Sequence, residues 1–535
     1  MSKRSWSLGT MFLSLLFIGL LYVSSASAAL PTITPSPAGS HGYPYDSALP
    51  EILNLSSLGY TEHEFLMSGT TNIYAEKGMW ASNGQWGVSV TKSDVPYTTR
   101  LLVRYPTNPA KFNGSVVVEW MNDTTGGDQD PVWAQMVNQI TQAGFAYVGV
   151  TAQNAGMVDL RQWDPARYGS LGDSGDGQSY DIFTQAAQVI RADSSTLLGG
   201  LTPKYVIGTG DSQSAFRVDT YVNAFQPLSH AYNAFIAIGR WAGAAPIGNG
   251  FVGLPDPSYV RTDNTAPFIQ VNGQGDIEEI GAAVARQPDN EDLRTWEVAG
   301  ASHIDDHEGG YEVTEELLEQ PSTIDVIPAC TLGTPIEGTG TPLDGINQAD
   351  NMPLFEVEDA ALADMQKWLA GGVAAPHEPS QLSVDPVLFG LYDLVPTNQY
   401  GIASGGIQLP EAQVPTEYYN PVNFSVGTAA SYTPTALLAD LEEEIGLYET
   451  GGIPITDTSG RSLGLCLLSG FFEDLPSSTL SSLYPTDAAY VSRYTAAVNA
   501  DVEAGFITPA DGAAAIANAQ AGHGPSQGPP AQVIP

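Results

Sequence analysis

The sequence predicts an α/β protein built around a doubly wound, mostly parallel β-sheet. Runs of strand length that are almost entirely apolar, such as 115–121 and 145–150, alternate with segments that carry apolar residues at helical spacing, such as 131–144. Strands that are apolar on both faces are typical of parallel sheets covered by helices on both sides. A further strand pattern, 205–211, passes through small residues directly into a helical pattern.

The predicted elements follow in a regular order. After a Pro/Ser/Gly-rich lead-in at 30–49, residues 58–104 alternate between polar and apolar side chains as strands do. The next predicted strands are 115–121, 145–150, 205–211, 234–238, 267–271 and 295–299, and the helices between them are 131–144, 181–198, 215–225 and 278–286. The segment 153–180 interrupts this rhythm because it is rich in Asp, Gly and Ser. We therefore expect the strand 205–211 near the middle of the sheet.

The pattern weakens beyond about residue 308, which suggests how the chain is organised. We predict an α/β core at 29–310 and additional helices and loops at 311–520, packed on the core as a cap or as a C-terminal part of the same domain. Helix candidates in that part are 360–369, 434–448 and 487–505. Residues 521–535 have the composition of a flexible tail.

The N-terminus has the features of a secretory signal peptide. Lys3 and Arg4 form a basic start, 11–23 is apolar, and Ala26-Ser27-Ala28 supplies a small-x-small cleavage site. We predict that residues 1–28 are removed after Ala28 and that the protein is secreted or periplasmic. An uncleaved membrane anchor is the alternative, which the short apolar run disfavours. No later stretch is long and apolar enough to span a bilayer.

The charge of the chain limits its partners. It has 59 acidic residues against 19 Lys and Arg, a formal net charge of −40 at pH 7. Signal cleavage would remove two basic residues and no acid, which takes the charge to about −42. Such a surface repels nucleic acids and anionic membranes, so we expect neither as a partner.

The two cysteines, Cys330 and Cys466, are predicted to form a disulfide because export passes through an oxidising compartment. Two unpaired buried thiols are the alternative. Acids gather at 122–130 (Asp123, Asp128 and Asp130) and at 173–177 (Asp173 and Asp176), but their spacing is not that of an EF-hand loop. We expect them to be hydrated loop acids, with a calcium site as the alternative, and no metal site is predicted.

A candidate nucleophile lies where the strand 205–211 meets the following helix. Gly210-Asp211-Ser212-Gln213-Ser214 has the form of a nucleophile elbow, G-x-S-x-G, with serine in place of the last glycine. Small residues two positions before and after Ser212 allow a sharp turn to close. Ser214 is a rival nucleophile, but its own flanks are not both small.

A serine nucleophile needs a base and a group that orients the base. His303 follows the strand 295–299 and is the predicted base, with His307 as the competitor. Asp276 ends the Gly-rich turn after the strand 267–271 and is the predicted acid. Glu278 and Glu279 are alternatives that fit exposed charges at a helix start better.

An oxyanion intermediate requires backbone donors, and two are predicted. One is the N–H of Gln213 at the helix N-terminus, and the other is the N–H of Asn122 in the loop after the strand 115–121. Trp120, Trp163 and Tyr180 are candidate walls of a substrate pocket. Ordinary core packing is the somewhat more favoured role for each of these rings.

These residues resemble the α/β-hydrolase superfamily, and more narrowly a group of secreted bacterial α/β-hydrolase-domain proteins that act as serine esterases. The similar segments are 117–122, 169–171, 178–183, 211–215, 286–289, 296–300 and 405–410. The resemblance implies a serine hydrolase that acts on small-molecule esters without a cofactor. The acid loop of such proteins is more usually Thr-Glu-Thr-Asp, where this chain has Gly273-Gln274-Gly275-Asp276.

The leading hypothesis is therefore a secreted serine carboxylesterase that forms an acyl-enzyme on Ser212. The same three residues would also serve amide hydrolysis or acyl transfer. A different class of function, a catalytically silent binding protein on a hydrolase scaffold, is the remaining alternative.

Overall fold

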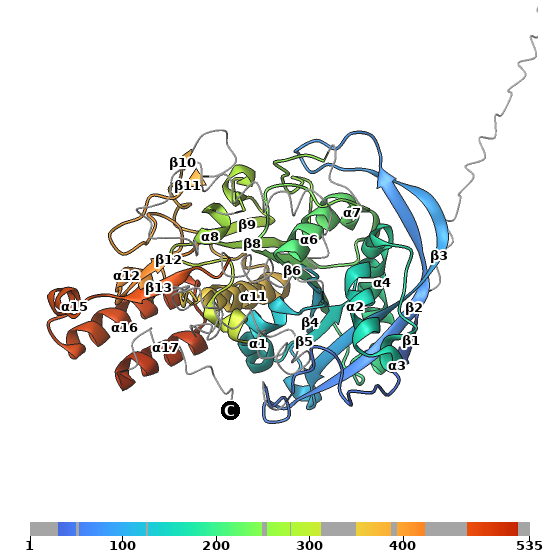
Figure 1. Ribbon diagram of the computed structural model, residues 1–535, viewed down its shortest axis with the longest axis horizontal. Coiled ribbons are helices and arrows are strands. Elements are labelled where there is room, and N and C mark those ends of the chain that lie inside the picture. Colours follow the sequence, from blue (N-terminus) through green and yellow to red (C-terminus); the bar gives the residue numbers. More distant parts are fainter. Residues whose placement is uncertain are drawn as a thin grey trace, which may run out of the picture.

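A nine-stranded sheet organises the part of the chain that the computed structural model describes, which is residues 30–49, 53–124, 127–248, 254–278, 280–311, 349–386, 393–422 and 468–522. Figure 1 shows the sheet between layers of helices, with α15 to α17 at one end of the molecule and the long strands β2 and β3 at the other. The predicted signal peptide 1–28, Cys330, Cys466, Glu279 and the predicted helix 434–448 lie outside the described residues.

The strands lie in the order β1-β2-β3-β5-β4-β6-β7-β8-β9. From β5 to β9 in this order all pairs are parallel, while β1 to β3 form an antiparallel edge that joins β5. The predicted doubly wound, mostly parallel sheet is confirmed. Its strands are β1 (Thr32–Pro35), β2 (Tyr60–Glu76), β3 (Val88–Pro106), β4 (Ser115–Trp120), β5 (Ala146–Val150), β6 (Tyr205–Asp211), β7 (Ala234–Ile238), β8 (Phe268–Gly273) and β9 (Leu293–Val298).

Helices follow most of the parallel strands, as the sequence predicts. They are α1 (Pro131–Ala143), α2 (Asn154–Trp163), α3 (Pro165–Tyr168), α4 (Ser179–Ala192), α5 (Ser194–Leu197), α6 (Gln213–Ala224), α7 (Gln226–Ser229), α8 (Gln274–Glu278), α11 (Leu354–Gly371), α12 (Pro410–Gln413), α15 (Ser477–Leu483), α16 (Asp487–Ala504) and α17 (Pro509–Ala521). Two small sheets pair β10 (Asp385–Pro386) with β11 (Asp393–Leu394) and β12 (Glu417–Asn420) with β13 (Phe471–Asp474). Within the described residues, no helix has the length and apolarity that crossing a bilayer demands.

The apolar strands are buried on both faces because each face has its own core. Along β4, Val116 and Val118 belong to one hydrophobic cluster, and Val117 between them belongs to the other. Helices α4 and α6 contribute to the first cluster, whereas α1 and α11 contribute to the second. Alternation of side chains along a strand explains why a covered sheet needs continuous apolar runs.

The polar residue at the end of β4 starts the helix that follows. Glu119 is fully buried, and its carboxylate accepts hydrogen bonds from the N–H groups of Val132 (2.9 Å) and Trp133 (3.1 Å) in the first turn of α1. The hydroxyl of Tyr147 on β5 donates to the same carboxylate at 2.7 Å. A buried acid in an apolar strand is accommodated because it satisfies N–H groups that a helix start leaves open.

Three parts of the chain differ from the predicted pattern. The segment 153–180 contains α2 and α3, and the Asp164 side chain begins α3 by accepting from the N–H groups of Ala166 and Arg167. The predicted helix 278–286 is wrong, because α8 ends at Glu278 and Gly281 adopts a left-handed conformation (φ +66°) before a 3₁₀ turn, η3 (Ala282–Ala285). Helix α17, an Ala-rich segment, was not predicted.

The described residues beyond 349 are tied directly to the sheet. Helix α11 packs against α1, β7 and β8. The backbone of Ile407 continues the sheet past β9, since its N–H donates to the Glu297 carbonyl at 2.7 Å and its carbonyl accepts from the Ala299 N–H at 3.0 Å. Gly406 precedes it with φ +66°, and a Cβ there would lie 2.6 Å from the Glu297 carbonyl oxygen. Only glycine fits that close approach.

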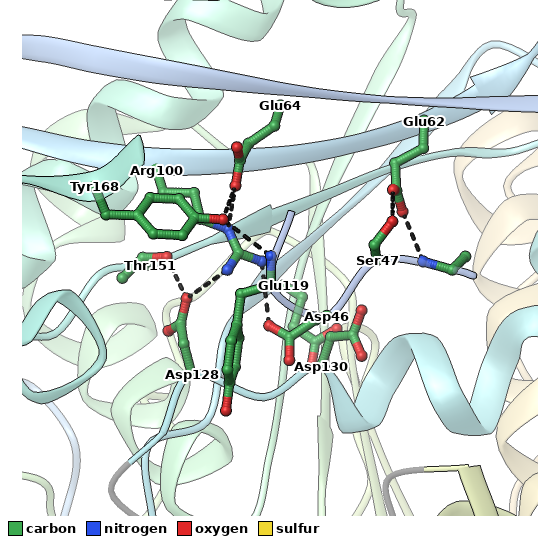
Figure 2. A network of polar contacts seen from close by, with 12 residues as sticks. Asp46, Ser47, Glu62, Glu64, Arg100, Glu119, Asp128, Asp130, Thr151 and Tyr168 are labelled. Carbon is green, nitrogen blue, oxygen red and sulfur yellow. Dashed lines mark hydrogen bonds and ion pairs between the residues drawn. The ribbon is translucent and has the colours of Figure 1, made fainter. Parts of the chain in front are cut away.

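A buried arginine joins the N-terminal lead-in to the sheet (Figure 2). Arg100 on β3 is fully buried, with carboxylate oxygens of Asp46 at 3.1 Å, Glu64 at 3.4 Å and Asp128 at 3.7 Å from its guanidinium nitrogens. These acids come from the lead-in, from β2 and from the loop after β4. One side chain thus holds three segments that are far apart in the sequence.

Four acids on α11, α12, α16 and α17 (Glu356, Glu411, Asp501 and Asp511) lie close enough for the last three to act on the charge of Glu356. Helix α16 packs against both α12 and α17. Burial raises the pKa of Glu356 and Glu411, raises the pKa of Asp501 to about 7 and raises the pKa of Asp511 to about 6. The folded chain therefore holds protons that the unfolded chain has already lost.

We expect this cluster to make the folded state less stable as the pH rises. Acids with a raised pKa favour folding fully below their ordinary pKa values, and that contribution is lost as the pH passes their values in the folded state. The thermal midpoint is expected to fall by several degrees from about pH 5 to about pH 8, and Glu411→Gln should flatten the dependence. Calorimetry at constant ionic strength measures it. A midpoint that rises over this interval would contradict the prediction.

Candidate active site

Ser212 lies at the tip of a sharp turn between β6 and α6. Its backbone has φ +53° and ψ −122°, a conformation that is strained for a residue with a side chain. A Cβ on Gly210 would lie 2.7 Å from the carbonyl group of Ser214, so the turn closes only with glycine there. Ser212 is partly exposed, which leaves its hydroxyl accessible at the carboxyl end of the central strand.

The hydrogen bonds of the Ser214 hydroxyl explain why serine stands in place of the last glycine of the motif. Its hydroxyl accepts a hydrogen bond from the Asp211 N–H at 3.0 Å and donates one to the Asp211 carbonyl at 2.8 Å. The serine side chain thus ties the turn together from inside. Because Ser214 is fully buried and its hydroxyl is used in this way, it is unsuited to be the rival nucleophile.

The structure brings Ser212, His303 and Asp276 together. Nε2 of His303 lies 2.9 Å from Ser212 Oγ, and Nδ1 lies 2.5 Å from Asp276 Oδ1. His303 is 4% exposed and Asp276 is 1% exposed, so both partners are shielded from water. A carboxylate on Nδ1 favours the tautomer that carries its hydrogen there, which leaves Nε2 to accept from the serine hydroxyl.

Close backbone approaches fix the acid and the base relative to each other. The Gly273 N–H donates to the second oxygen of Asp276 at 2.6 Å. A Cβ on Gly273 would lie 2.5 Å from the Ser302 carbonyl oxygen, and a Cβ on Gly275 would lie 3.1 Å from the backbone nitrogen of His303. The Gly-rich form of this acid loop, which differs from the more usual Thr-Glu-Thr-Asp, thus lets the loops after β8 and β9 pack backbone to backbone.

The competing residues lie elsewhere. The His307 ring stacks on Phe355, with ring centroids 4.2 Å apart. Glu278 accepts a hydrogen bond from the Gln274 side chain at 2.9 Å, and burial raises the pKa of Glu278 to about 7. Neither side chain is hydrogen-bonded to Ser212 or His303.

The backbone donors differ in part from the prediction. Gln213 is the first residue of α6, so its N–H points out of the helix start beside Ser212. The Asn122 N–H, however, donates to the Gln129 carbonyl at 2.9 Å and is not available to an oxyanion. The Asn122 side chain instead donates to the Asp211 carbonyl at 3.1 Å, which fastens the loop after β4 to the elbow.

The aromatic candidates are core residues. Trp120 and Tyr180 are fully buried and pack edge to face, with ring centroids 5.2 Å apart. The Trp120 indole donates to Gln153 and the Tyr180 hydroxyl donates to the Pro246 carbonyl. Trp163 stacks on His41 of the lead-in, with ring centroids 4.0 Å apart. These contacts replace the predicted pocket walls with packing, the alternative that the sequence also allowed.

The loop acids are mostly engaged with other side chains. Asp128 lies beside Arg100, Asp130 pairs with buried Arg104, and Asp176 pairs with Arg217 at 3.3 Å. Asp123 accepts from the Gln153 amide and Asp173 accepts from the Asn154 amide. The expectation of hydrated loop acids is therefore wrong for the buried Asp128 and Asp130. Among the described residues, no group of three or more His, Cys, Asp or Glu is arranged to hold a metal ion.

Comparison with known families agrees with the fold. A family model described as an alpha/beta hydrolase domain matches residues 32–517, which is most of the chain. The chain belongs to this family.

Solved structures show weaker likenesses to this α/β hydrolase domain. An α/β serine hydrolase without a lid from Xanthomonas campestris is 14% identical, with 46% of this chain and 92% of that chain covered and a TM-score of 0.26. A CE15 glucuronoyl esterase from Teredinibacter turnerae is 10% identical, with 55% and 79% covered and a TM-score of 0.27. Among curated proteins, no sequence matches significantly. Scores this low do not bear on function.

Two charged residues of this α/β hydrolase domain were not singled out from the sequence. Asp211 stands directly before Ser212 and was visible in the motif, but nothing in the motif indicates where its side chain points. Glu358 lies on α11, and no motif marks it. Both are almost completely buried; the charges of His303 and Asp276 act on Asp211, and the charge of Asp276 acts on Glu358.

Proposed function

We propose that this protein is a secreted serine hydrolase that cleaves carboxylic esters of small molecules through an acyl-enzyme intermediate. The observation that carries the proposal is the single imidazole of His303, which bridges Ser212 Oγ at 2.9 Å and Asp276 Oδ1 at 2.5 Å. A serine hydroxyl becomes an effective nucleophile when a base takes its proton and a third group holds the base.

Each step of the proposed reaction uses one of these contacts. Ser212 Oγ attacks the ester carbonyl carbon while its proton passes to Nε2 of His303. Asp276 holds the ring by Nδ1 and stabilises the imidazolium that forms. The imidazolium then gives the proton to the departing alcohol oxygen, which leaves an acyl group on Ser212. A water molecule then attacks the acyl carbon while Nε2 of His303 takes its proton. The ring returns this proton to Ser212 Oγ, and the carboxylic acid leaves. The chemistry draws only on these side chains and water.

The oxyanion of the tetrahedral intermediate needs two donors. The Gln213 N–H at the start of α6 is the first, where the helix dipole also favours negative charge. For the second we propose the N–H of Asp123 in place of Asn122. The Asn122 side chain fixes this loop by donating to the Asp211 carbonyl and by accepting from the Thr124 N–H at 2.8 Å, and Asp123 lies between these two residues in the sequence.

Secretion is part of the proposal, and it rests on the basic, apolar and small-x-small pattern of residues 1–28. A disulfide between Cys330 and Cys466 follows from the same export route.

A fluorophosphonate probe tests the proposal, because it reacts covalently with activated serines. We expect the exported protein to be labelled on the peptide that contains Ser212, to hydrolyse short p-nitrophenyl esters, and to lose both properties in Ser212→Ala. Ser229→Ala, a serine at the end of α7, is the matched control and should keep both. The same peptide map identifies the mature N-terminus, expected at Ala29, and the linkage of the two cysteines.

Other outcomes favour the alternatives. Labelling of Ser212 without ester turnover would favour amide hydrolysis or acyl transfer by the same residues. Absence of both labelling and turnover would favour a binding protein. Labelling of another serine, or unchanged activity in Ser212→Ala, would refute the assignment of the nucleophile.

A further inference from the structure

A second carboxyl group lies beside the His303 imidazole. Asp211 is the last residue of β6 and is 2% exposed, and its Oδ2 has no hydrogen-bond partner among the described residues. A Cβ on Gly239 would lie 2.6 Å from His303 Cε1, 2.8 Å from His303 Nδ1 and 3.5 Å from Asp211 Oδ1. The imidazole and the Asp211 carboxyl therefore both border the same small space, which a glycine (φ +57°) keeps open.

The backbone around Asp211 is fixed, which sets the direction in which its side chain leaves the end of β6. The Ser214 hydroxyl bonds to both its N–H and its carbonyl, and the Asn122 side chain donates to the same carbonyl. The unusual serine of the elbow motif thus also anchors the residue before the nucleophile.

A third carboxyl group belongs to the same cluster. Glu358 on α11 is fully buried, and neither of its carboxylate oxygens has a hydrogen-bond partner among the described residues. Of the charged groups that act on Glu358, Asp211 has the largest effect, followed by Asp305, Asp359 and Asp276. Helix α11 packs across β7 and β8, the two strands next to β6 on this side of the sheet.

Asp211 and Glu358 cannot both be ionised while the His303 imidazole is neutral. Burial raises the pKa of Asp211 to about 7, the positive charge of His303 acts in the opposite direction, and the charges of Asp276 and Asp305 raise it further. Burial also raises the pKa of Glu358 well above its ordinary value, and the charge of Asp211 raises it further, so Glu358 stays protonated while Asp211 ionises. A proton on His303 therefore makes ionisation of Asp211 easier, and a charged Asp211 in turn favours the protonated imidazole.

We propose that Asp211 is a positioning group that sets the pH at which His303 becomes able to take the proton of Ser212. This inference rests on the proposed function. Asp211 acts through the imidazole and touches no reacting atom. Once the Ser212 proton reaches Nε2, the Asp211 carboxylate offers the buried imidazolium a second negative charge besides Asp276. Glu358 stays uncharged while Asp211 ionises, so it supplies packing and no charge in this pH range.

Two isosteric variants separate the charge of Asp211 from the packing of this buried cluster. Asp211→Asn removes the charge that favours the protonated imidazole, so His303 becomes a free base at lower pH. Glu358→Gln replaces a carboxyl group that is uncharged while Asp211 titrates, so the Asp211 charge should appear at the same pH as in the wild type. We expect the midpoint of the acid limb of kcat/KM to move down by about one pH unit in Asp211→Asn and by less than about 0.3 unit in Glu358→Gln.

The experiment measures kcat/KM for a short ester in a pH-stat, and the fluorophosphonate labelling rate, between about pH 5 and about pH 9. Asp263→Asn is the matched control and should not shift the profile, because Asp263 is a half-exposed acid that pairs with Arg261. A downward shift in Asp211→Asn alone supports the proposal, because loss of packing would affect both buried variants. An unshifted or upward-shifted midpoint in Asp211→Asn, or an equal downward shift in Glu358→Gln, would overturn it.

Its failure is distinguishable from failure of the proposed function. If the wild type is labelled on Ser212 and hydrolyses esters but Asp211→Asn leaves the midpoint in place, only the role of Asp211 is refuted. If the wild type is not labelled and does not turn over esters, both proposals fall. Should Asp211→Asn not fold, Asp211→Ser takes its place, and an acid limb that does not move downward in it refutes the role.

Discussion

Replacing His303 with alanine is expected to lower kcat for ester hydrolysis by about 10⁵-fold to 10⁶-fold. Among the described residues, the imidazole is the one group that contacts both Ser212 Oγ and Asp276 Oδ1, so its removal takes away the base and cuts the acid off from the reaction. The activity that remains would come from the oxyanion donors and from substrate binding.

Asp276→Asn should cost less, about 10⁴-fold in kcat, because asparagine keeps the shape but favours the wrong tautomer of the imidazole. The double variant should be no slower than His303→Ala alone, since Asp276 acts through the ring. Steady-state and single-turnover rates with a p-nitrophenyl ester measure these effects.

His307→Ala is the matched control, because this ring stacks on Phe355 and is not hydrogen-bonded to Ser212. It should keep kcat within a few-fold of the wild type. The assignment of the base would fail if His303→Ala lost less than about tenfold, or if His307→Ala lost as much as His303→Ala.

The sequence was sufficient to predict which three side chains meet, because chain order and strand ends constrain them together. In a parallel sheet the carboxyl ends of neighbouring strands share one edge, and Ser212, Asp276 and His303 each follow a strand of that part of the sheet. Apolar periodicity placed those strands correctly. Two buried faces also explain why the strands carry so few polar residues.

The features that were missed depend on contacts that local patterns do not encode. The role of Ser214 became clear only with the geometry of the turn that its hydroxyl closes. The Asn122 N–H pairs with Gln129 across a loop, which no spacing rule anticipates. Glu358 reaches the site from a helix that follows a long segment outside the described residues. In each case burial and pairing, rather than residue type, decide the role.

Replacing Arg100 with methionine is expected to destabilise the fold by about 3–5 kcal/mol at neutral pH. Methionine fills much of the same volume, so the loss would come from charge and not from a cavity. Three buried carboxyl groups, those of Asp46, Glu64 and Asp128, would lose the guanidinium that lies within 3.7 Å of each of them (Figure 2). An unpaired buried charge costs more than a paired one contributes.

The pH dependence of this loss identifies its cause. Burial raises the pKa of Asp128 to about 6, and the Arg100 charge acts against this shift. Without the arginine the carboxyl groups can escape the penalty by taking up protons, so the destabilisation should shrink as the pH falls from about 8 to about 5. Urea unfolding of wild type and variant at each pH measures it.

Arg261→Met breaks an ion pair whose Asp263 side chain is 54% exposed, and it should cost less than about 1 kcal/mol at every pH. If Arg100→Met lowered the free energy of unfolding no more than Arg261→Met does, the buried cluster would contribute little to the attachment of the N-terminal lead-in. A loss that did not change with pH would point to packing instead of charge.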